Sequence, residues 1–169
     1  TSNPSSPSPT IGGQTLHNNL EQGPYDQSTL DVRSDVITFS TGELTEDVTI
    51  NGRVTLNLFV ESNQPDVDIA IRLVDEYTDG RNMLINDGIR RMRFRNGYRQ
   101  TDEVFMETGN VYPVEITLPF THYTWKAGSK IKVYVSSNHS IRWNVNLQDG
   151  GTMYQPGTGN IATIAIHHN

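Results

Sequence analysis

The amino-acid sequence predicts an all-β fold in which two antiparallel sheets pack as a sandwich or jelly roll. Apolar residues recur at every second position in several short segments, which is the spacing of a strand with one buried face. Gly, Asn, Asp and Pro separate these segments, and turns at intervals of roughly 8–15 residues are typical of β-sandwiches. No longer window repeats apolar residues at the i, i+3, i+4 and i+7 positions of an amphipathic helix. We therefore expect roughly nine strands and no long helix.

Length and composition limit what the chain can be. Its 169 residues suffice for one well-filled domain and are few for two. The formal net charge of −6 argues against nucleic acid or an anionic membrane as a partner, and no apolar run approaches the roughly 20 residues of a membrane span. The absence of cysteine excludes disulfides and thiolate metal sites. We expect neither a nucleic-acid nor a membrane partner, and the cellular location stays open.

The first 22 residues are expected to form an interdomain linker and entry loop, and the sandwich to occupy residues 23–169. Residues 1–10 contain three prolines and four serines. Such a composition buries too little apolar surface to order itself and is typical of an extended tether. Gly23-Pro24 is a turn signal, after which the strand patterns begin.

The centre of the predicted core is a pair of alternating segments, residues 53–61 and 65–75. The short polar connection between them predicts an antiparallel pair joined by a hairpin-like loop. Asn51-Gly52 and Asp79-Gly80 have the residue types of tight turns before and after this pair. The further strands that we expect, in chain order, are 35–40, 45–50, 83–86, 89–95, 111–118, 129–137 and 161–166, and the glycine-rich residues 138–160 are expected to form a long ordered loop.

No set of residues has the spacing of a catalytic centre. The pentapeptide G-x-S-x-G, which places a serine nucleophile on a sharp turn, does not occur. Ser136, Ser137 and His139 are close in the sequence, but a triad also needs a carboxylate that orients the histidine. We interpret these three residues as polar loop residues and expect no catalytic residue in this chain.

Metal ligation is not expected either. The five histidines lack the helical or clustered spacing of a metal site, and the adjacent His167 and His168 would point to opposite faces of a strand. Asp66 and Asp68 share one strand face, but no glycine-containing loop of oxygen ligands, as calcium prefers, surrounds them. A solvated strand edge is the simpler interpretation, and we expect no metal and no other cofactor.

A row of arginines is the most conspicuous charged feature. On a strand, Arg91, Arg93 and Arg95 would share one face, with Met92 and Phe94 on the opposite, apolar face. Such a row can be a solvated face, or it can meet carboxylates of another domain, because arginine suits interfacial ion pairs. Basic residues between aromatic ones can also bind nucleic acid, which the net charge disfavours. The first two interpretations stay open, and the three arginines are candidates for an interdomain contact.

Aromatic residues offer an alternative function, because exposed aromatic rings can stack on sugars. Tyr123 and Trp125 lie two residues apart and would share a strand face, and Trp143 lies in the long loop. These three residues are candidates for a carbohydrate contact. The simpler interpretation is that they lie at the edge of the core.

Several blocks of the sequence resemble, in the same order, the C-terminal domain of X-Pro dipeptidyl-peptidases and of cocaine-esterase-like serine hydrolases. The three longest blocks are residues 45–52 (TEDVTING), 72–81 (RLVDEYTDGR) and 87–95 (DGIRRMRFR). Shorter matches at residues 3–13, 109–112 and 125–128 extend the resemblance over nearly the whole chain.

The resemblance implies a galactose-binding-like jelly roll that holds no residue of a catalytic triad. In those enzymes the triad lies in a separate α/β-hydrolase domain, which this domain would contact while helping to shape the substrate cleft. The parent would be a serine hydrolase acting on an ester, an amide or an X-Pro peptide bond. The alternative is a carbohydrate-binding β-sandwich module, which rests on fold analogy alone.

The chain departs from the family in three places. Ser129 and Ile141 stand where the family commonly has histidine and proline, and a final apolar strand of the family would follow Asn169. If that strand is absent, its neighbour becomes an unpaired edge, which would favour self-association into a homo-oligomer.

Overall fold

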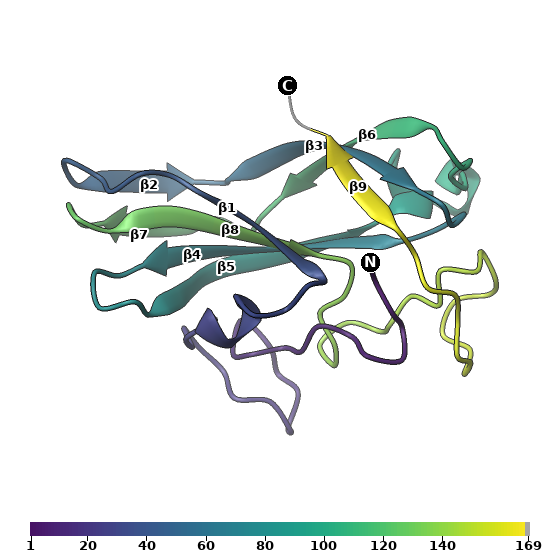
Figure 1. Cartoon of the computed structure of the whole chain (residues 1–169), viewed down its shortest axis with the longest axis horizontal. Coiled ribbons are helices and arrows are strands. Elements are labelled where there is room, and N and C mark those ends of the chain that lie inside the picture. Colours follow the sequence, from purple (N-terminus) through teal and green to yellow (C-terminus); the bar gives the residue numbers. More distant parts are fainter. Residues whose placement is uncertain (168–169) are drawn as a thin grey trace.

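The structure, a computed structural model, describes residues 1–167 and is a sandwich of two β-layers (Figure 1). It confirms the predicted all-β class, while the jelly-roll path stays a prediction. Its strands and short 3-10 helices, in chain order, are η1 Ser28–Leu30, β1 Val36–Ser40, β2 Val48–Gly52, β3 Thr55–Ser62, β4 Asp68–Glu76, β5 Asn82–Arg91, η2 Met92–Phe94, η3 Gln100–Asp102, β6 Val111–Thr117, β7 Thr121–Trp125, β8 Lys130–Ser136 and β9 Ile164–His167. Among these residues no helix is long and apolar enough to cross a membrane.

Both layers are built from antiparallel pairs. One layer is the sheet β1-β8-β4-β5, and the other combines the sheet β6-β3-β9 with the pair β2-β7 (Figure 1). β1 lies at an edge of its sheet, and self-association through such an edge stays a prediction.

The predicted hairpin between β3 and β4 is wrong, because the two strands lie in different sheets. β3 pairs with β6 and β9, whereas β4 pairs with β5 and β8. Likewise, Asn51-Gly52 ends β2, which pairs with β7, and is not a hairpin turn. The alternation of a strand shows which side chains are buried, but it does not show whether the next strand pairs with it or faces it across the core.

The main hydrophobic core fills the space between the layers. The inward side chains of β3 and β4 are buried or partly buried, as their alternation predicted, and Val60 and Ile71 are fully buried. β6, β7 and β8 contribute further core residues, such as Ile116, Trp125 and Val135. Because side chains from both layers meet here, this burial holds the two sheets together.

A covering layer of loops lies on the other face of the sheet β1-β8-β4-β5. Residues 1–33 and 137–163 run beneath this sheet (Figure 1). Leu30, Val74, Leu84 and Tyr134 form a second apolar cluster there. As a result β4 is buried on both faces, although its sequence alternates between apolar and polar residues.

The N-terminal segment is part of this cover, so residues 1–10 are ordered within the domain, which their composition did not predict. Ser8 is fully buried, and Ser2 exchanges two backbone hydrogen bonds with Ala162. Arg72 of β4 reaches this segment, since its Nη2 donates to the carbonyl oxygen of Pro9 at 2.7 Å and to the Oγ of Ser8 at 3.1 Å. A charged residue thus orders a stretch whose composition predicts disorder. A connection from this segment to another domain stays a prediction.

β5 is a single strand where the sequence predicted two. Asp87-Gly88 lies inside it, and a Cβ on Gly88 would come within 2.7 Å of a methyl group of Leu118, so glycine here fits close packing inside the strand and does not mark a turn. The turn at Asp79-Gly80 is confirmed, with a φ of +90° at Gly80, and it joins β4 to β5. β5 ends at Arg91, where the chain enters η2.

Candidate functional site

The arginine row does not lie on one strand face, because β5 ends at Arg91 and the chain turns into η2. Arg91 forms a two-pronged ion pair with Asp68 of β4, with Nε to Oδ1 at 2.8 Å and Nη2 to Oδ2 at 2.9 Å. Burial raises the pKa of the Asp68 carboxyl, and the hydrogen bonds from Arg91 and Asn146 oppose that rise. The sequence-based interpretation that Asp68 lies on a solvated strand edge is therefore wrong.

Arg93 is the most deeply buried of the three arginines, with 4% of its surface exposed. Its Nε donates to Oδ2 of Asp66 at 2.7 Å, and its backbone N–H donates to Oδ1 of the same carboxylate. Asn146 donates to both Asp66 and Asp68, at 2.8 Å and 3.0 Å, and so ties the long loop to this pair. Arg93 also pairs with Glu103 at 3.0 Å. A solvated face is thus the wrong interpretation for Arg93.

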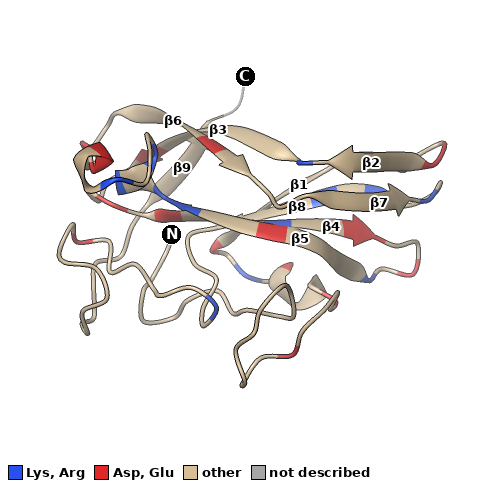
Figure 2. Cartoon of the chain, turned by 180° about the vertical axis from the view of Figure 1, so that it is seen from behind, with Lys and Arg blue, Asp and Glu red and all other residues tan. Residues whose placement is uncertain are grey.

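Arg95 binds backbone carbonyl oxygens of Met92 and Val104, and its guanidinium lies 4.2 Å from the ring centre of Tyr112. Each arginine of the predicted row therefore has partners inside this chain. Figure 2 shows basic and acidic segments side by side at this end of the molecule. A contact between these arginines and another domain stays a prediction.

A histidine, a carboxylate and serines do come together under the four-stranded sheet. His139 lies with its Nδ1 3.7 Å from Oδ2 of Asp87, which is beyond hydrogen-bond distance. Asp87 forms an ion pair with Arg142 instead. The Oγ of Ser136 donates to the carbonyl oxygen of Asn138 and accepts from Arg72. Among residues 1–167, no serine is hydrogen-bonded to the ring of His139, so the geometry of a catalytic triad is missing at this position.

His139 is also too weak a base for catalysis. It is almost fully buried, and burial together with the charges of Arg72 and Arg142 lowers its pKa to about 2. The ring is therefore neutral at ordinary pH, and it packs against Trp143, with ring centres 4.9 Å apart. That Ser136, Ser137 and His139 form no catalytic centre stays a prediction.

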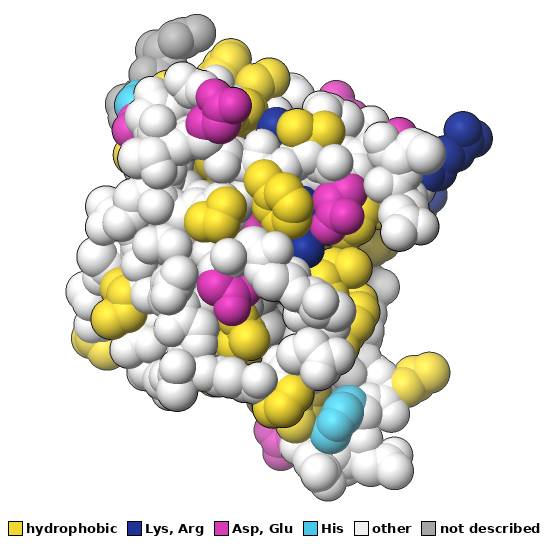
Figure 3. Space-filling view, turned by 90° about the vertical axis from the view of Figure 1, so that its right-hand side faces the viewer, with side chains coloured by type: hydrophobic (Ala, Val, Ile, Leu, Met, Phe, Trp, Pro, Cys, Tyr) yellow, Lys and Arg dark blue, Asp and Glu magenta, His cyan; other side chains and the backbone are white. Residues whose placement is uncertain are grey.

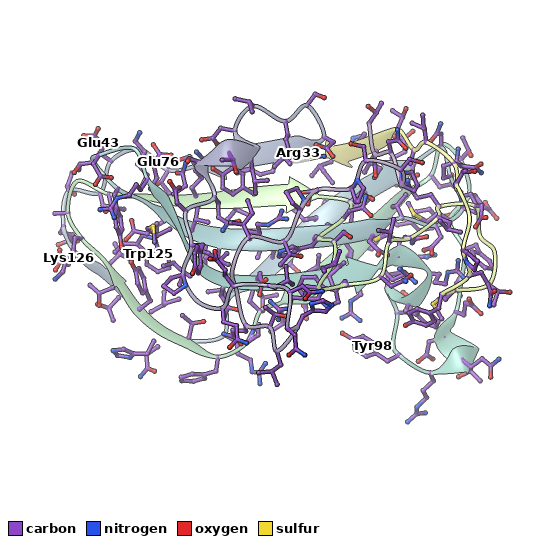
Figure 4. The ribbon with its side chains drawn as sticks, turned by 90° about the horizontal axis from the view of Figure 1, so that it is seen from below. Arg33, Glu43, Glu76, Tyr98, Trp125 and Lys126 are labelled. Carbon is purple, nitrogen blue, oxygen red and sulfur yellow. The ribbon has the colours of Figure 1, made fainter. Side chains whose placement is uncertain are left out.

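The candidates for a carbohydrate contact separate in space. Trp125 is 1% exposed, lies in the main core and donates its indole N–H to the carbonyl oxygen of Val74 (Figure 4). A ring buried in this way cannot stack on a sugar, so Trp125 is not available for a carbohydrate contact. Tyr123 packs edge-on against Trp125 and donates its hydroxyl to Asp75 at 2.8 Å. Trp143 is half-buried and lines a surface hollow on another part of the molecule. No shared aromatic platform results.

No group of three or more His, Cys, Asp and Glu side chains that could hold a metal ion occurs among residues 1–167. His167 instead lies 3.0 Å from Glu61 on the neighbouring strand. His168, which the sequence placed on the opposite face, lies outside the described residues.

Two of the hollows on the surface of residues 1–167 bear on the candidate site. The aromatic hollow, about 380 Å³ in volume, lies between the end of β5 and the long loop, and Phe94, Tyr98 and Trp143 line it. The loop hollow, about 330 Å³, lies beside residues 13–23 and is lined mainly by apolar surface, including Pro24 and Ile85. Sequence reasoning missed both hollows, because each joins segments that are distant in the chain.

The loop beside the second hollow is closed at its neck and apolar at its tip. Gly13 and Gly23 exchange two backbone hydrogen bonds, of 2.8 Å and 3.1 Å. Leu16, between them, is 90% exposed. An apolar side chain held out on a closed loop is well placed to contact a neighbouring molecule or domain.

Comparisons with known proteins agree on one family. The chain is 37% identical over 150 residues to cocaine esterase of Rhodococcus sp. (strain MB1 Bresler), and that stretch is 89% of this chain but 26% of the esterase. Its fold superposes on an α-amino acid ester hydrolase with a TM-score of 0.87, at 23% identity over 98% of this chain and 29% of the other. An aminopeptidase of a marine sediment archaeon of the Thaumarchaeota gives a TM-score of 0.85, at 22% identity over 98% of this chain and 30% of the other.

These two structural matches show a shared fold, and the chain spans less than a third of the length of each of these relatives. The family model described as the X-Pro dipeptidyl-peptidase C-terminal non-catalytic domain matches residues 4–169. The chain therefore belongs to the family of C-terminal non-catalytic domains of X-Pro dipeptidyl-peptidases and cocaine-esterase-like hydrolases.

Proposed function

We propose that this chain serves a larger serine hydrolase of the esterase, acylase or X-Pro dipeptidyl-peptidase type, in which it packs on an α/β-hydrolase domain and helps to bound the substrate cleft. The observation that carries the proposal is the family match over residues 4–169, together with relatives that are more than three times as long as the matched segment. A β-sandwich that accompanies an enzyme without holding its triad can act by contact and by shape.

The chemistry of the described residues supports a non-catalytic role. Where serine, histidine and carboxylate meet under the four-stranded sheet, Asp87 is bound to Arg142 and His139 stays neutral. A general base needs a pKa near the working pH and a hydrogen bond to the nucleophile, and this histidine has neither.

The surface around the loop hollow is our candidate for the contact with the catalytic domain. It combines an apolar concavity with the exposed Leu16, and aliphatic and aromatic side chains of this kind dominate the centres of domain interfaces. The closed neck between Gly13 and Gly23 limits the loop's freedom, so less conformational entropy is lost when it is covered.

Two experiments test the proposal. The purified 169-residue chain should show no inhibitor-sensitive hydrolysis, with a p-nitrophenyl ester or an X-Pro p-nitroanilide as substrate and a serine-directed inhibitor as the control. Clear inhibitor-sensitive turnover would refute a non-catalytic role.

In the full-length hydrolase, Leu16→Asp should raise KM or lower the melting temperature. The matched control is Ile161→Asp, another exposed apolar residue, which lies away from the loop hollow. Losing one buried apolar contact is worth about 1.5–3 kcal/mol, so we expect a change of about tenfold in KM or several degrees in melting temperature. Equal behaviour of the two variants would reject this contact surface.

A further inference from the structure

The aromatic hollow is a concave site that the proposed function does not use. It lies at the end of the molecule seen in Figure 3, where apolar side chains gather beside acidic and basic ones. Its volume of about 380 Å³ is within the range of small-ligand sites. Its walls are Ile89, Phe94, Trp143 and Met153, with Tyr98 and Tyr154 at the rim. Tyr98 is 80% exposed and projects from the ribbon in Figure 4.

Among the described residues that line the hollow, Arg90 is a cation without a carboxylate partner. Asp68 and Arg91 both line it, but they neutralise each other through two hydrogen bonds, and Arg91 also donates to the carbonyl oxygen of Asn144. Arg90 pairs with no carboxylate among residues 1–167. Its guanidinium lies 4.3 Å from the ring centre of Tyr98 and donates a single long hydrogen bond, of 3.4 Å, to the carbonyl oxygen of Phe94. Most of its N–H donors therefore remain available to an anion.

The hollow is held in shape before any ligand arrives. The ring of Trp143 is fixed on one side by Arg142, at 4.3 Å, and by the edge of His139. Arg142 is in turn fixed by its ion pair with Asp87. The loop that carries Trp143 is tied down by Asn146, which donates to two buried carboxylates. A preformed site loses less entropy on binding than one that must first order its walls.

We propose that the aromatic hollow binds a small aryl carboxylate, with the carboxylate on the guanidinium of Arg90 and the flat ring against Trp143 and Phe94. A planar guanidinium matches the geometry of a carboxylate, and flat apolar groups pack well on aromatic walls. Arg90 has no carboxylate partner among residues 1–167 and lies in an apolar hollow, so the site should bind an anion more tightly than a neutral ring of the same size. This local preference is expected although the whole chain has a net charge of −6. The same carboxylate is also present at the C-terminus of a peptide that ends in an aromatic residue.

The two tryptophans make the test specific to the site. In ¹⁵N-labelled chain, the indole N–H signals of Trp143 and Trp125 are titrated with 2-naphthoate and with neutral 2-naphthamide, and Trp143→Phe assigns the two signals. We expect a saturable shift of the Trp143 signal, whereas the signal of Trp125, buried in the core, stays unchanged. Affinity for 2-naphthamide should be about tenfold lower, because its interaction with Arg90 lacks a charge.

Arg90→Gln should weaken 2-naphthoate binding by about tenfold or more, since a hydrogen-bonded charge is removed. Arg53→Gln, which removes an exposed arginine far from the hollow, should leave the affinity unchanged. The affinity for N-acetyl-Gly-Phe is compared with that for 2-naphthoate. Tighter binding of N-acetyl-Gly-Phe would indicate the C-terminus of a peptide as the natural ligand, and tighter binding of 2-naphthoate would indicate a free aryl acid.

Equal affinities for 2-naphthoate and 2-naphthamide, or a Trp143 signal that does not move, would overturn the proposal. The comparison of the two naphthyl ligands needs no variant, so the test stands even if Arg90→Gln does not fold. None of these measurements depends on the catalytic activity of a parent enzyme.

Discussion

Replacing Arg93 by methionine is expected to destabilise this domain more than any exposed charge substitution. The Arg93 side chain is 5% exposed and that of Asp66 is 0% exposed, and their closest atoms are 2.7 Å apart. Arg93→Met leaves the Asp66 carboxylate buried without its cation, with only the backbone N–H of residue 93 and the amide of Asn146 as donors. Breaking a buried ion pair in this way costs about 3–5 kcal/mol.

The assay is urea unfolding followed by tryptophan fluorescence. With an m-value of about 2 kcal/mol per molar urea, the midpoint should fall by about 2 M. Arg53→Met removes an exposed arginine and should change the stability by less than about 0.5 kcal/mol. The double variant Asp66→Asn with Arg93→Met should recover at least about 1 kcal/mol relative to Arg93→Met, because the unpaired charge is gone.

A loss below about 1 kcal/mol for Arg93→Met would refute the reasoning, since Arg93 would then be no more important than a surface charge. A double variant as unstable as the sum of the single ones would show that Asp66 and Arg93 act independently.

Two further predictions concern a glycine and a glutamate. Gly88→Ala should lower the free energy of unfolding by about 1–3 kcal/mol, because its Cβ would clash with Leu118 at 2.7 Å. Gly42→Ala, with open space around it, is the control and should change the stability little. Equal effects of the two variants in thermal unfolding would contradict the packing argument. Hydrogen bonds from Lys130, and then from Lys132, lower the pKa of Glu76 below its ordinary value of 4.5, so its contribution to stability is present above pH 4.5 and is lost as the pH falls through the lower folded-state pKa. Glu76→Gln should therefore lower the free energy of unfolding by about 1 kcal/mol at pH 7 and by less at pH 3. Glu46→Gln is the exposed control. A stability loss of Glu76→Gln that grows as the pH falls would contradict the prediction.

Strand positions could be predicted from the sequence because the period of two is a local property. Segments such as 35–40 and 111–118 lie within a residue of the observed β1 and β6. β7 was not among the predicted strands, although Tyr123 and Trp125 were expected to share a strand face, and its place in the fold is set by pairing with β2, some 70 residues earlier. The family could be recognised because its blocks follow one another along the chain.

The candidate site was predicted less well, because burial of polar residues depends on segments that are distant in the chain. For Arg93 the alternating pattern left a solvated face and an interdomain contact open, yet the side chain is buried and pairs with Asp66 and Glu103 of the same chain. For Trp125 the sequence left a carbohydrate contact and a place at the edge of the core open, whereas the structure buries it in the core. In both cases the local pattern shows the residue type, and only the packing shows what covers it.

The sequence by itself determined that this protein is an all-β sandwich of a known family, since side-chain alternation, turn residues and motif order are all local and linear. Only the tertiary structure decided that the strands β3 and β4 belong to opposite layers, that the N-terminal segment covers β4, and that the arginine row is held largely inside the domain. The reason is physical: pairing, cover and ion-pair partners are chosen by the free energy of contacts between residues far apart in the chain, which no local pattern encodes.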